Sequence, residues 1–285
     1  NCSIQGLSIE FSNNKVTDIR VGGIVGHLYI YGGVEAHVSN SFVQNLVINA
    51  NVTSNSGVGG IVGYKGHDSD EKVKPGTPYV YIENCYNTGK ISTTNNTGGI
   101  LGYGHFDNTY VKNCYSMVNI TSNVTAGNAY IGGIVGYNAK GATISDCASY
   151  LSDYDNSIYN TIVNNWEAKA DYAGGIAGYN DGNILFSEES HNITVKSVSS
   201  IVVGEDYVGG VVGFNDVNAR ISVNYTLIGG RIYAFGKCAG GAFGLNASAS
   251  VTESDLKIRP RSVEGQLFVG GCIGANLVNT NNDLV

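Results

Sequence analysis

Apolar residues along this chain come in short stretches rich in Ile, Val and Tyr, separated by Gly, Asn and Ser. No stretch places its apolar residues at the spacing of one helix face. Short β-branched and aromatic stretches bounded by turn residues are typical of strands. The pattern therefore predicts an all-β protein without helices.

A Gly-Gly-x-x-Gly motif recurs along the whole chain. Its eight copies begin at Gly22, Gly59, Gly98, Gly132, Gly174, Gly209, Gly240 and Gly270. Successive copies are 37, 39, 34, 42, 35, 31 and 30 residues apart. Self-similarity at a period of this size indicates a repeat architecture.

The positions around the motif repeat as well. An aromatic residue follows the last Gly in most copies. About ten residues after each Gly pair comes a second apolar stretch, and a third β-branched stretch follows in most copies. Each repeat is therefore expected to contain about three short strands joined by Gly and Asn turns.

A unit this small cannot bury its apolar face alone, so neighbouring units must stack. Parallel stacking at about 4.8 Å predicts a parallel β-solenoid (β-helix) of about eight coils. We expect a single solenoid region over 1–285, a segment of a longer chain, with insertions near 65–80 and 150–171. A propeller is the alternative, but the hairpin turns that its blades need are scarce here.

Each repeated column has an expected role. The motif glycines are expected at positive φ or at corners too crowded for a Cβ. The residue after each Gly pair is expected to face inward: Ile24, Ile61, Ile100, Ile134, Ile176, Val211, Ala242 and Cys272. Stacked amides are expected to form a hydrogen-bonded ladder of Asn138, Asn180, Asn215, Asn246 and Asn276.

Composition then constrains the partners and the compartment. The net charge is −7 and no basic stretch occurs, which argues against nucleic acid. No apolar run is long enough to span a bilayer. Asn-x-Ser/Thr sequons, which suit a secreted glycoprotein, occur at Asn1, Asn51, Asn95, Asn119, Asn123, Asn192, Asn224 and Asn246.

The core Gly-Gly-Ile-Val-Gly-Tyr-Asn, with Asn-Cys-Tyr-Asn-Thr-Gly-Lys-Ile at 84–91, resembles the GLUG motif. That motif occurs in tandem in microbial surface proteins, adhesins and regions flanking some immunoglobulin A peptidases. The resemblance covers essentially the whole chain. It implies an extracellular or cell-surface protein, and the motif itself carries no catalytic residues.

Four cysteines share one column in the predicted stack: Cys2, Cys85, Cys114 and Cys147. Neighbouring Cα atoms in this column would lie close enough for a disulfide. The alternative, which we favour, is a column of small buried thiols in positions where other coils carry Ser. No Cys-x-x-Cys occurs, so a zinc or redox site is not expected.

Enzymatic chemistry finds little support in the sequence, and we expect no catalytic residues, cofactor or metal. A polysaccharide-cleaving β-helix would need carboxylates gathered across adjacent coils. The acidic run with Asp68, Asp70 and Glu71 matches no calcium loop, and Trp166 lies in the second insertion. Trp166 is expected to pin its loop, or else to anchor a ligand.

The sequence therefore predicts a structural or adhesive extracellular repeat protein, part of a surface stalk or fibre, and not an enzyme. Its expected partners are other copies stacked head-to-tail or host and matrix glycans. The alternative is a carbohydrate-binding or polysaccharide-cleaving β-helix. A carbohydrate-binding adhesin would expose a row of Tyr or Trp along one face.

Overall fold

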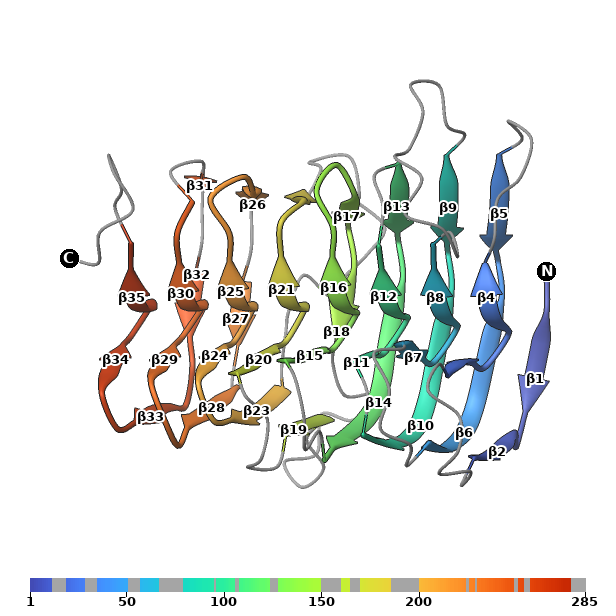
Figure 1. Ribbon diagram of the computed structural model, residues 1–285, viewed down its shortest axis with the longest axis horizontal. Helices are drawn as coiled ribbons and strands as arrows, with labels where there is room; N and C mark the ends of the chain where they lie inside the picture. Colours follow the sequence, from blue (N-terminus) through green and yellow to red (C-terminus); the bar gives the residue numbers. More distant parts are fainter. Residues whose placement is uncertain are drawn as a thin grey trace.

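The computed structural model describes residues 1–11, 19–28, 35–50, 57–66, 79–94, 96–105, 108–123, 128–149, 160–164, 170–185, 200–223, 226–228, 230–248, 251–253 and 257–277. Within these ranges, side chains are described for all but 160–164, 170, 200, 223, 226–228, 251–253 and 257–259. These residues form 35 strands and no helix. Every strand pairing between them is parallel (Figure 1), which excludes the propeller and confirms the β-solenoid.

Each full coil passes through four sheets, whereas the sequence predicts about three strands in each repeat. The difference arises at the Gly-Gly-x-x-Gly motif. One strand ends on the first Gly and the next begins three residues later, so the motif is a corner between two sheets. The chain climbs from β1 (Ser3–Gln5) at one end of the stack to β35 (Ile273–Asn276) at the other (Figure 1).

The first sheet carries the longest strands, and these begin directly after positions of the cysteine column such as Cys85 and Cys114. We call the bend at these positions the cysteine corner. Its strands are β1, β2 (Ser8–Phe11), β6 (Phe42–Ala50), β10 (Tyr86–Thr93), β14 (Tyr115–Ser122), β18 (Ala148–Ser149), β19 (Asn160–Asn164), β23 (Ser200–Gly204), β28 (Arg231–Ala234) and β33 (Ser262–Gly265). We call it the long-strand sheet.

The second sheet ends on the first Gly of each motif and is called the pre-Gly sheet. Its strands are β3 (Arg20–Gly22), β7 (Gly57–Gly59), β11 (Asn96–Gly98), β15 (Asn128–Gly132), β20 (Ala170–Gly174), β24 (Tyr207–Gly209), β29 (Cys238–Gly240) and β34 (Phe268–Gly270).

The third sheet follows the motif corner and is called the post-Gly sheet. Its strands are β4 (Val25–Leu28), β8 (Val62–Lys65), β12 (Leu101–Gly104), β16 (Val135–Asn138), β21 (Ala177–Asn180), β25 (Val212–Asn215), β30 (Phe243–Asn246) and β35.

The fourth sheet precedes the cysteine corner and is called the pre-Cys sheet. Its strands are β5 (Ala36–Ser39), β9 (Val80–Glu83), β13 (Thr109–Lys112), β17 (Thr143–Ser145), β22 (Asn183–Leu185), β26 (Arg220–Val223) and β31 (Val251–Glu253). A separate pair joins β27 (Thr226–Ile228) to β32 (Lys257–Arg259).

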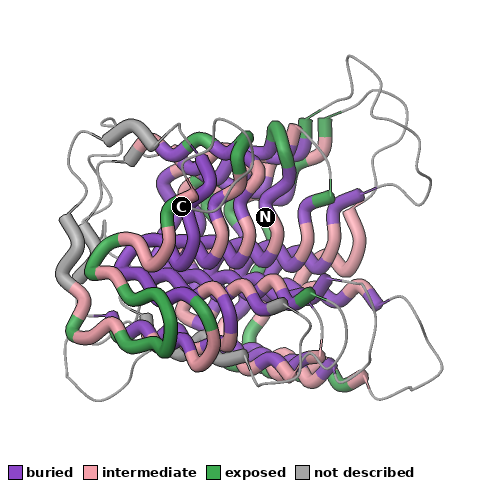
Figure 2. Tube along the Cα trace, turned by 60° about the vertical axis from the view of Figure 1, so that its left-hand side comes forward, coloured by how far each residue is buried: buried purple, intermediate pink, exposed green. Residues whose placement is uncertain are grey.

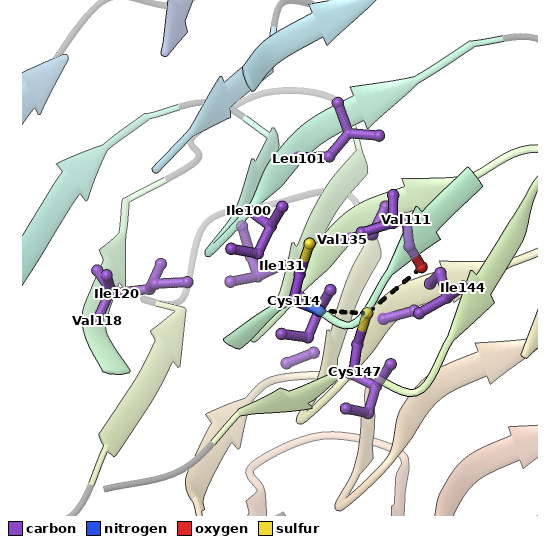
Figure 3. Close-up of a cluster of buried hydrophobic side chains, with 14 of the residues drawn as sticks. Ile100, Leu101, Val111, Cys114, Val118, Ile120, Ile131, Val135, Ile144 and Cys147 are labelled. Atoms are coloured by element: carbon purple, nitrogen blue, oxygen red, sulfur yellow. Dashed lines mark hydrogen bonds between the residues drawn. The ribbon is translucent and has the colours of Figure 1, made fainter. Parts of the chain in front are cut away.

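The interior of the stack is an aliphatic core that runs from coil to coil (Figures 2 and 3). The predicted inward column is fully buried through its middle: Ile61, Ile100, Ile134 and Ile176. At the last described coil the same column ends on Cys272, which is exposed. Leu267, Phe268 and Val269 of that coil are exposed as well. Burial in this fold therefore depends on a neighbouring coil.

The motif glycines are required by crowding and not by their φ angles. Among the described glycines, only Gly6, Gly89 and Gly141 have positive φ, and none of them belongs to the motif. A Cβ on Gly132 would overlap the carbonyl oxygen of Val135 and lie 2.8 Å from that of Ile176. The motif thus lets two neighbouring backbones approach at the corner more closely than any side chain permits.

Candidate functional site

Two aromatic columns form the most extensive side-chain array on the described surface. One follows the motif in the post-Gly sheet and contains His27, Tyr64, Tyr103, Tyr137, Tyr179 and Phe214. The other lies on the pre-Gly sheet and contains Tyr130, Tyr172 and Tyr207. Both arise because in-register parallel stacking places the same repeat position of each coil side by side.

Within each column the rings stack on one another. Tyr137 lies between Tyr103, at 4.8 Å between ring centroids, and Tyr179, at 5.3 Å, with interplanar angles of 14° and 16°. Tyr172 lies likewise between Tyr130 and Tyr207, at 5.3 Å from each. The two columns meet edge to face, since the ring of Tyr172 stands at 87° to that of Tyr179.

Cations cover ring faces near the ends of these columns. The guanidinium carbon of Arg20 lies 4.6 Å from the ring centroid of Tyr64. The ammonium of Lys237 lies 5.3 Å from that of Tyr207.

A sugar ring binds an aromatic side chain by stacking on its face. Here other rings or cations take both faces of all but some end rings of the columns. The rings covered on both faces are Tyr64, Tyr103, Tyr137, Tyr172, Tyr179 and Tyr207. We call the two columns together the double aromatic column. It has the row of Tyr expected of a carbohydrate-binding surface, but its rings pack on one another and support the stack.

Burial of the stacked phenols raises their pKa. The pKa of Tyr137 rises to about 12, chiefly by desolvation and then by the charge of Asp181. That of Tyr172 rises to about 12, chiefly by desolvation and then by Tyr130. The hydroxyl of Tyr179 donates to Asp216 at 2.5 Å, and desolvation with this hydrogen bond raises the pKa of Tyr179 further.

Alkaline pH should therefore loosen the aromatic columns. A phenol whose pKa is higher in the folded than in the unfolded chain stabilises the fold fully below pH 10, and that contribution is lost as pH rises toward 12. We expect a loss of about 2 kcal/mol for each of Tyr137 and Tyr172 over this window. Tyrosinate absorbance and circular dichroism, titrated together, measure it.

The double variant Tyr137→Phe, Tyr172→Phe is the matched test of this pH effect. It keeps the stacked rings and removes the two ionisable hydroxyls. Its unfolding midpoint should fall less between pH 10 and 12 than that of the wild type. Equal pH dependence of the two proteins would contradict the assignment.

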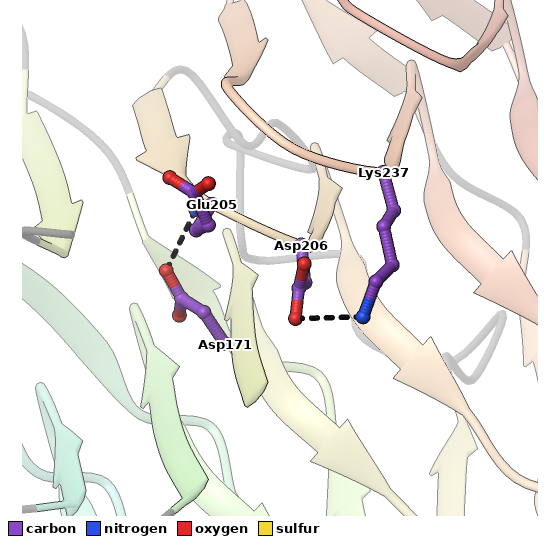
Figure 4. Close-up of polar contacts among 4 residues, drawn as sticks. All are labelled: Asp171, Glu205, Asp206 and Lys237. Atoms are coloured by element: carbon purple, nitrogen blue, oxygen red, sulfur yellow. Dashed lines mark hydrogen bonds and ion pairs between the residues drawn. The ribbon is translucent and has the colours of Figure 1, made fainter. Parts of the chain in front are cut away.

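Carboxylates gather at the corner that leads from the long-strand sheet into the pre-Gly sheet (Figure 4). Asp171, Asp206 and Lys237 occupy the same position on three consecutive coils, one residue before Tyr172, Tyr207 and Cys238. Sequence reasoning missed this cluster, and the repeated Asp-Tyr dipeptide was the signal that could have revealed it.

The charged side chains at this corner are engaged in hydrogen bonds between neighbouring coils. The buried carboxylate of Asp171 accepts a hydrogen bond from the backbone N–H of Glu205 at 2.8 Å. Lys237 donates to Asp206 at 3.1 Å. Burial lowers the pKa of Lys237, but the hydrogen bond and charge of Asp206 outweigh it, and the pKa lies above its ordinary value. Asp171 caps the turn of the next coil, and Lys237 neutralises Asp206.

This corner supplies no paired acid and base for glycoside cleavage, because Asp171 is committed to a backbone N–H and Asp206 to Lys237. No three His, Cys, Asp or Glu side chains come together to hold a metal within the described ranges. The acidic run with Asp68, Asp70 and Glu71 and the side chain of Trp166 lie outside those ranges. Part of the insertion predicted near 150–171 is instead regular structure, because β19 and the start of β20 fall within it.

The five asparagines after the aromatic column are brought together by the structure. Each of the first four donates its amide nitrogen to the side-chain oxygen of the next, at 2.7 Å from Asn138 to Asn180 and at 2.8–2.9 Å in the three later steps. Asn138, Asn180, Asn215 and Asn246 are buried. In this ladder, each inner amide accepts a hydrogen bond from one neighbouring coil and donates one to the other.

Asn246 belongs both to this ladder and to a sequon, and the two roles conflict. Its amide nitrogen donates to Asn276 and to the backbone oxygen of Ser248, so a glycan on that nitrogen would break the ladder. We therefore remove Asn246 from the glycosylation candidates. Asn1 is exposed, and Asn119 and Asn123 are half-buried. The remaining sequons, Asn51, Asn95, Asn192 and Asn224, lie outside the described residues.

A second ladder runs along the cysteine corner, and the sequence analysis did not identify it. Asn40, Asn84, Asn113 and Asp146 all have positive φ and each comes just before the cysteine-column position. Asn113 donates to Asn84 at 3.3 Å, and Asn84 donates to Asn40 at 3.4 Å. Asn and Asp tolerate this backbone conformation better than other residues with a Cβ, so the Asn-Cys dipeptides mark the corner.

The cysteine column is a set of free thiols. Cys85, Cys114 and Cys147 are buried and free, whereas Cys2 is exposed and its backbone N–H donates to Ser41. The Cys147 thiol donates to the carbonyl of Val111 and accepts from the backbone N–H of Cys114 (Figure 3). Burial raises the pKa of the Cys114 thiol well above its ordinary value, so it stays protonated and unreactive.

The fold has a counterpart among solved structures. A chain described as a "putative immunoglobulin A1 protease" from Bacteroides ovatus superposes with a TM-score of 0.52 over 91% of this chain and 67% of that one, at 20% identity. No family model matches the chain, and no curated protein is similar to it. At this identity the likeness shows the fold alone.

The comparison corrects one prediction. The sequence analysis concluded that the chain is not an enzyme, and a chain of the same fold is described as a protease. The error came from treating a solenoid repeat without catalytic residues as evidence against an enzyme. Repeat positions are set by stacking, so they carry no information on chemistry located elsewhere.

Proposed function

We propose that this chain is a β-solenoid segment of an extracellular surface protein, in which it acts as a structural and adhesive element. The observation that carries the proposal is the continuity of the stack. An aliphatic core, a buried amide ladder and a double aromatic column connect successive coils. Such a stack holds its ends at a fixed separation, as a stalk must. The resemblance to GLUG repeats and the exposed sequon at Asn1 support a location outside the cell.

Antibodies raised against the purified chain test the location. They should label intact, unpermeabilised cells of the source organism. Labelling that requires permeabilised cells would contradict the proposal. A mobility shift of the native protein after glycosidase treatment would add support for glycosylation at the remaining sequons.

A second candidate function follows from the likeness to the Bacteroides ovatus chain. We propose as the alternative that the solenoid is part of a proteolytic enzyme that cleaves immunoglobulin A1. Incubation of the native full-length protein with immunoglobulin A1, followed by gel electrophoresis, tests it. Heavy-chain fragments would favour this alternative, and an intact heavy chain would remove it.

Association of copies head-to-tail stays part of the first proposal. The exposed Leu267, Phe268 and Val269 give the last described coil an apolar surface that another coil could cover. Within the described residues, no helix is long and apolar enough to cross a membrane. A sedimentation coefficient that rises with concentration would support assembly, and monomers at every concentration would remove it.

A further inference from the structure

A second group of aromatic side chains lies on the outer face of the pre-Cys sheet, near the start of the chain. His37, Tyr81 and Tyr110 stack across three consecutive coils, at 4.7 Å and 5.4 Å between ring centroids. Tyr79 joins them from the residue just before β9. We call these four residues the aromatic patch.

The patch differs from the double aromatic column in the orientation of one ring. Tyr79 is tilted by 42° to Tyr81 and by 56° to Tyr110, so it is not part of the stack. Its counterparts on the adjoining coils are Glu35 and Asn108, which have no rings. Tyr79 is 39% exposed. An exposed, tilted ring without stacked neighbours on the adjoining coils can offer a face to a ligand.

Charged side chains of both signs lie at the two ends of the aromatic patch. Glu35 and His37 lie 3.5 Å apart, and their side chains are 53% and 48% exposed. Glu83 and Lys112 face each other across β9 and β13, two residues beyond the stacked rings on the same side of the sheet. Glu35 lies opposite Tyr79 on the adjoining coil, about 4.8 Å away, whereas Glu83 lies four residues beyond Tyr79 along the strand, roughly 13 Å away. A glycan must therefore extend over more than one sugar ring to reach both ends of the patch.

We propose that the aromatic patch binds a neutral glycan chain, with one pyranose ring stacked on Tyr79 and hydrogen-bonded by Glu35, and a further ring hydrogen-bonded by Glu83 and Lys112. Pyranose C–H groups pack on aromatic faces, and hydroxyls pair with carboxylates and ammonium groups. Because the flanking charges are of both signs, they favour a neutral ligand over an acidic one. This inference rests on the proposed adhesive function and names its partner.

Affinity electrophoresis of the full chain tests the site. The probes are hydroxyethyl cellulose, xylan, mannan and galactomannan, with polygalacturonate as the acidic comparison. At least one neutral polysaccharide should retard the chain, and Tyr79→Ala should weaken that retardation at least tenfold. Tyr79→Phe keeps the ring and should retain most of the binding.

The control is Tyr233→Ala, which removes a half-buried Tyr from β28 in the long-strand sheet and should bind like the wild type. Thermal unfolding of each variant shows whether the stack is intact, and Tyr79 is exposed enough for its loss to be tolerated. No retardation by any neutral probe, retardation by polygalacturonate alone, or equal binding by Tyr79→Ala would overturn the inference. The antibody test of surface location is independent of these outcomes, so the two proposals can fail separately.

Discussion

Gly132→Ala should lower the free energy of unfolding by about 4 kcal/mol, among the largest effects of any single substitution in this chain. A Cβ at this position would overlap the carbonyl oxygen of Val135 in its own corner and crowd that of Ile176 in the next coil. Both obstacles are backbone atoms held by the stack, so neither can move aside without breaking strand pairing. Urea denaturation followed by circular dichroism measures the change.

Gly271→Ala is the control, because it makes a Gly-to-Ala change at the second Gly of the last described motif, one position after the counterpart of Gly132. A Cβ there meets no atom within 4 Å. The expected cost is below about 0.5 kcal/mol. Comparable losses in Gly132→Ala and Gly271→Ala would show that the glycines act through chain entropy and that crowding at the corner is not the cause.

Asn180→Ala should cost about 3 kcal/mol. The side chain of Asn180 accepts from Asn138 and donates to Asn215 in the buried interior. Its removal leaves a donor on one side and an acceptor on the other without their ladder partners. A buried polar group that loses its partner carries the full penalty of desolvation. Chemical denaturation measures the loss.

Asn276→Ala is the matched control for the ladder. Asn276 accepts from Asn246 at the exposed end of the same column, where water can replace it. We expect a loss of at most about 1 kcal/mol. If Asn180→Ala proved as mild as Asn276→Ala, the ladder would be a consequence of stacking and not a contributor to stability.

The Gly-Gly-x-x-Gly period was sufficient to predict the solenoid, since only stacked units can bury the apolar side of a repeat this short. The inward Ile column and the Asn column followed from the same alignment of copies. The number of strands per coil did not, because the sequence analysis expected the motif glycines at a corner but did not assign separate strands to the two sides of that corner. The structure places β7 before this corner and β8 after it.

The candidate site was harder to predict for a physical reason. Columns can be read from the sequence, but the contacts between different columns depend on how the corners orient them. Tyr137 and Tyr172 lie in separate columns, and only the fold turns the edges of one column against the faces of the other. Asp171 likewise accepts its hydrogen bond from the backbone N–H of Glu205, which belongs to the column next to its own.

By itself, the sequence of this protein determined which residues share a column, because in-register parallel stacking converts the repeat period directly into spatial neighbours. Only the tertiary structure decided which columns face one another and which rings keep a free face. In the tertiary structure the inner rings of the double aromatic column are covered by stacked neighbours, whereas Tyr79 is tilted and exposed. The reason is that one-dimensional periodicity specifies the neighbours along the stack axis, whereas contacts across the coil depend on backbone corners that the period does not specify.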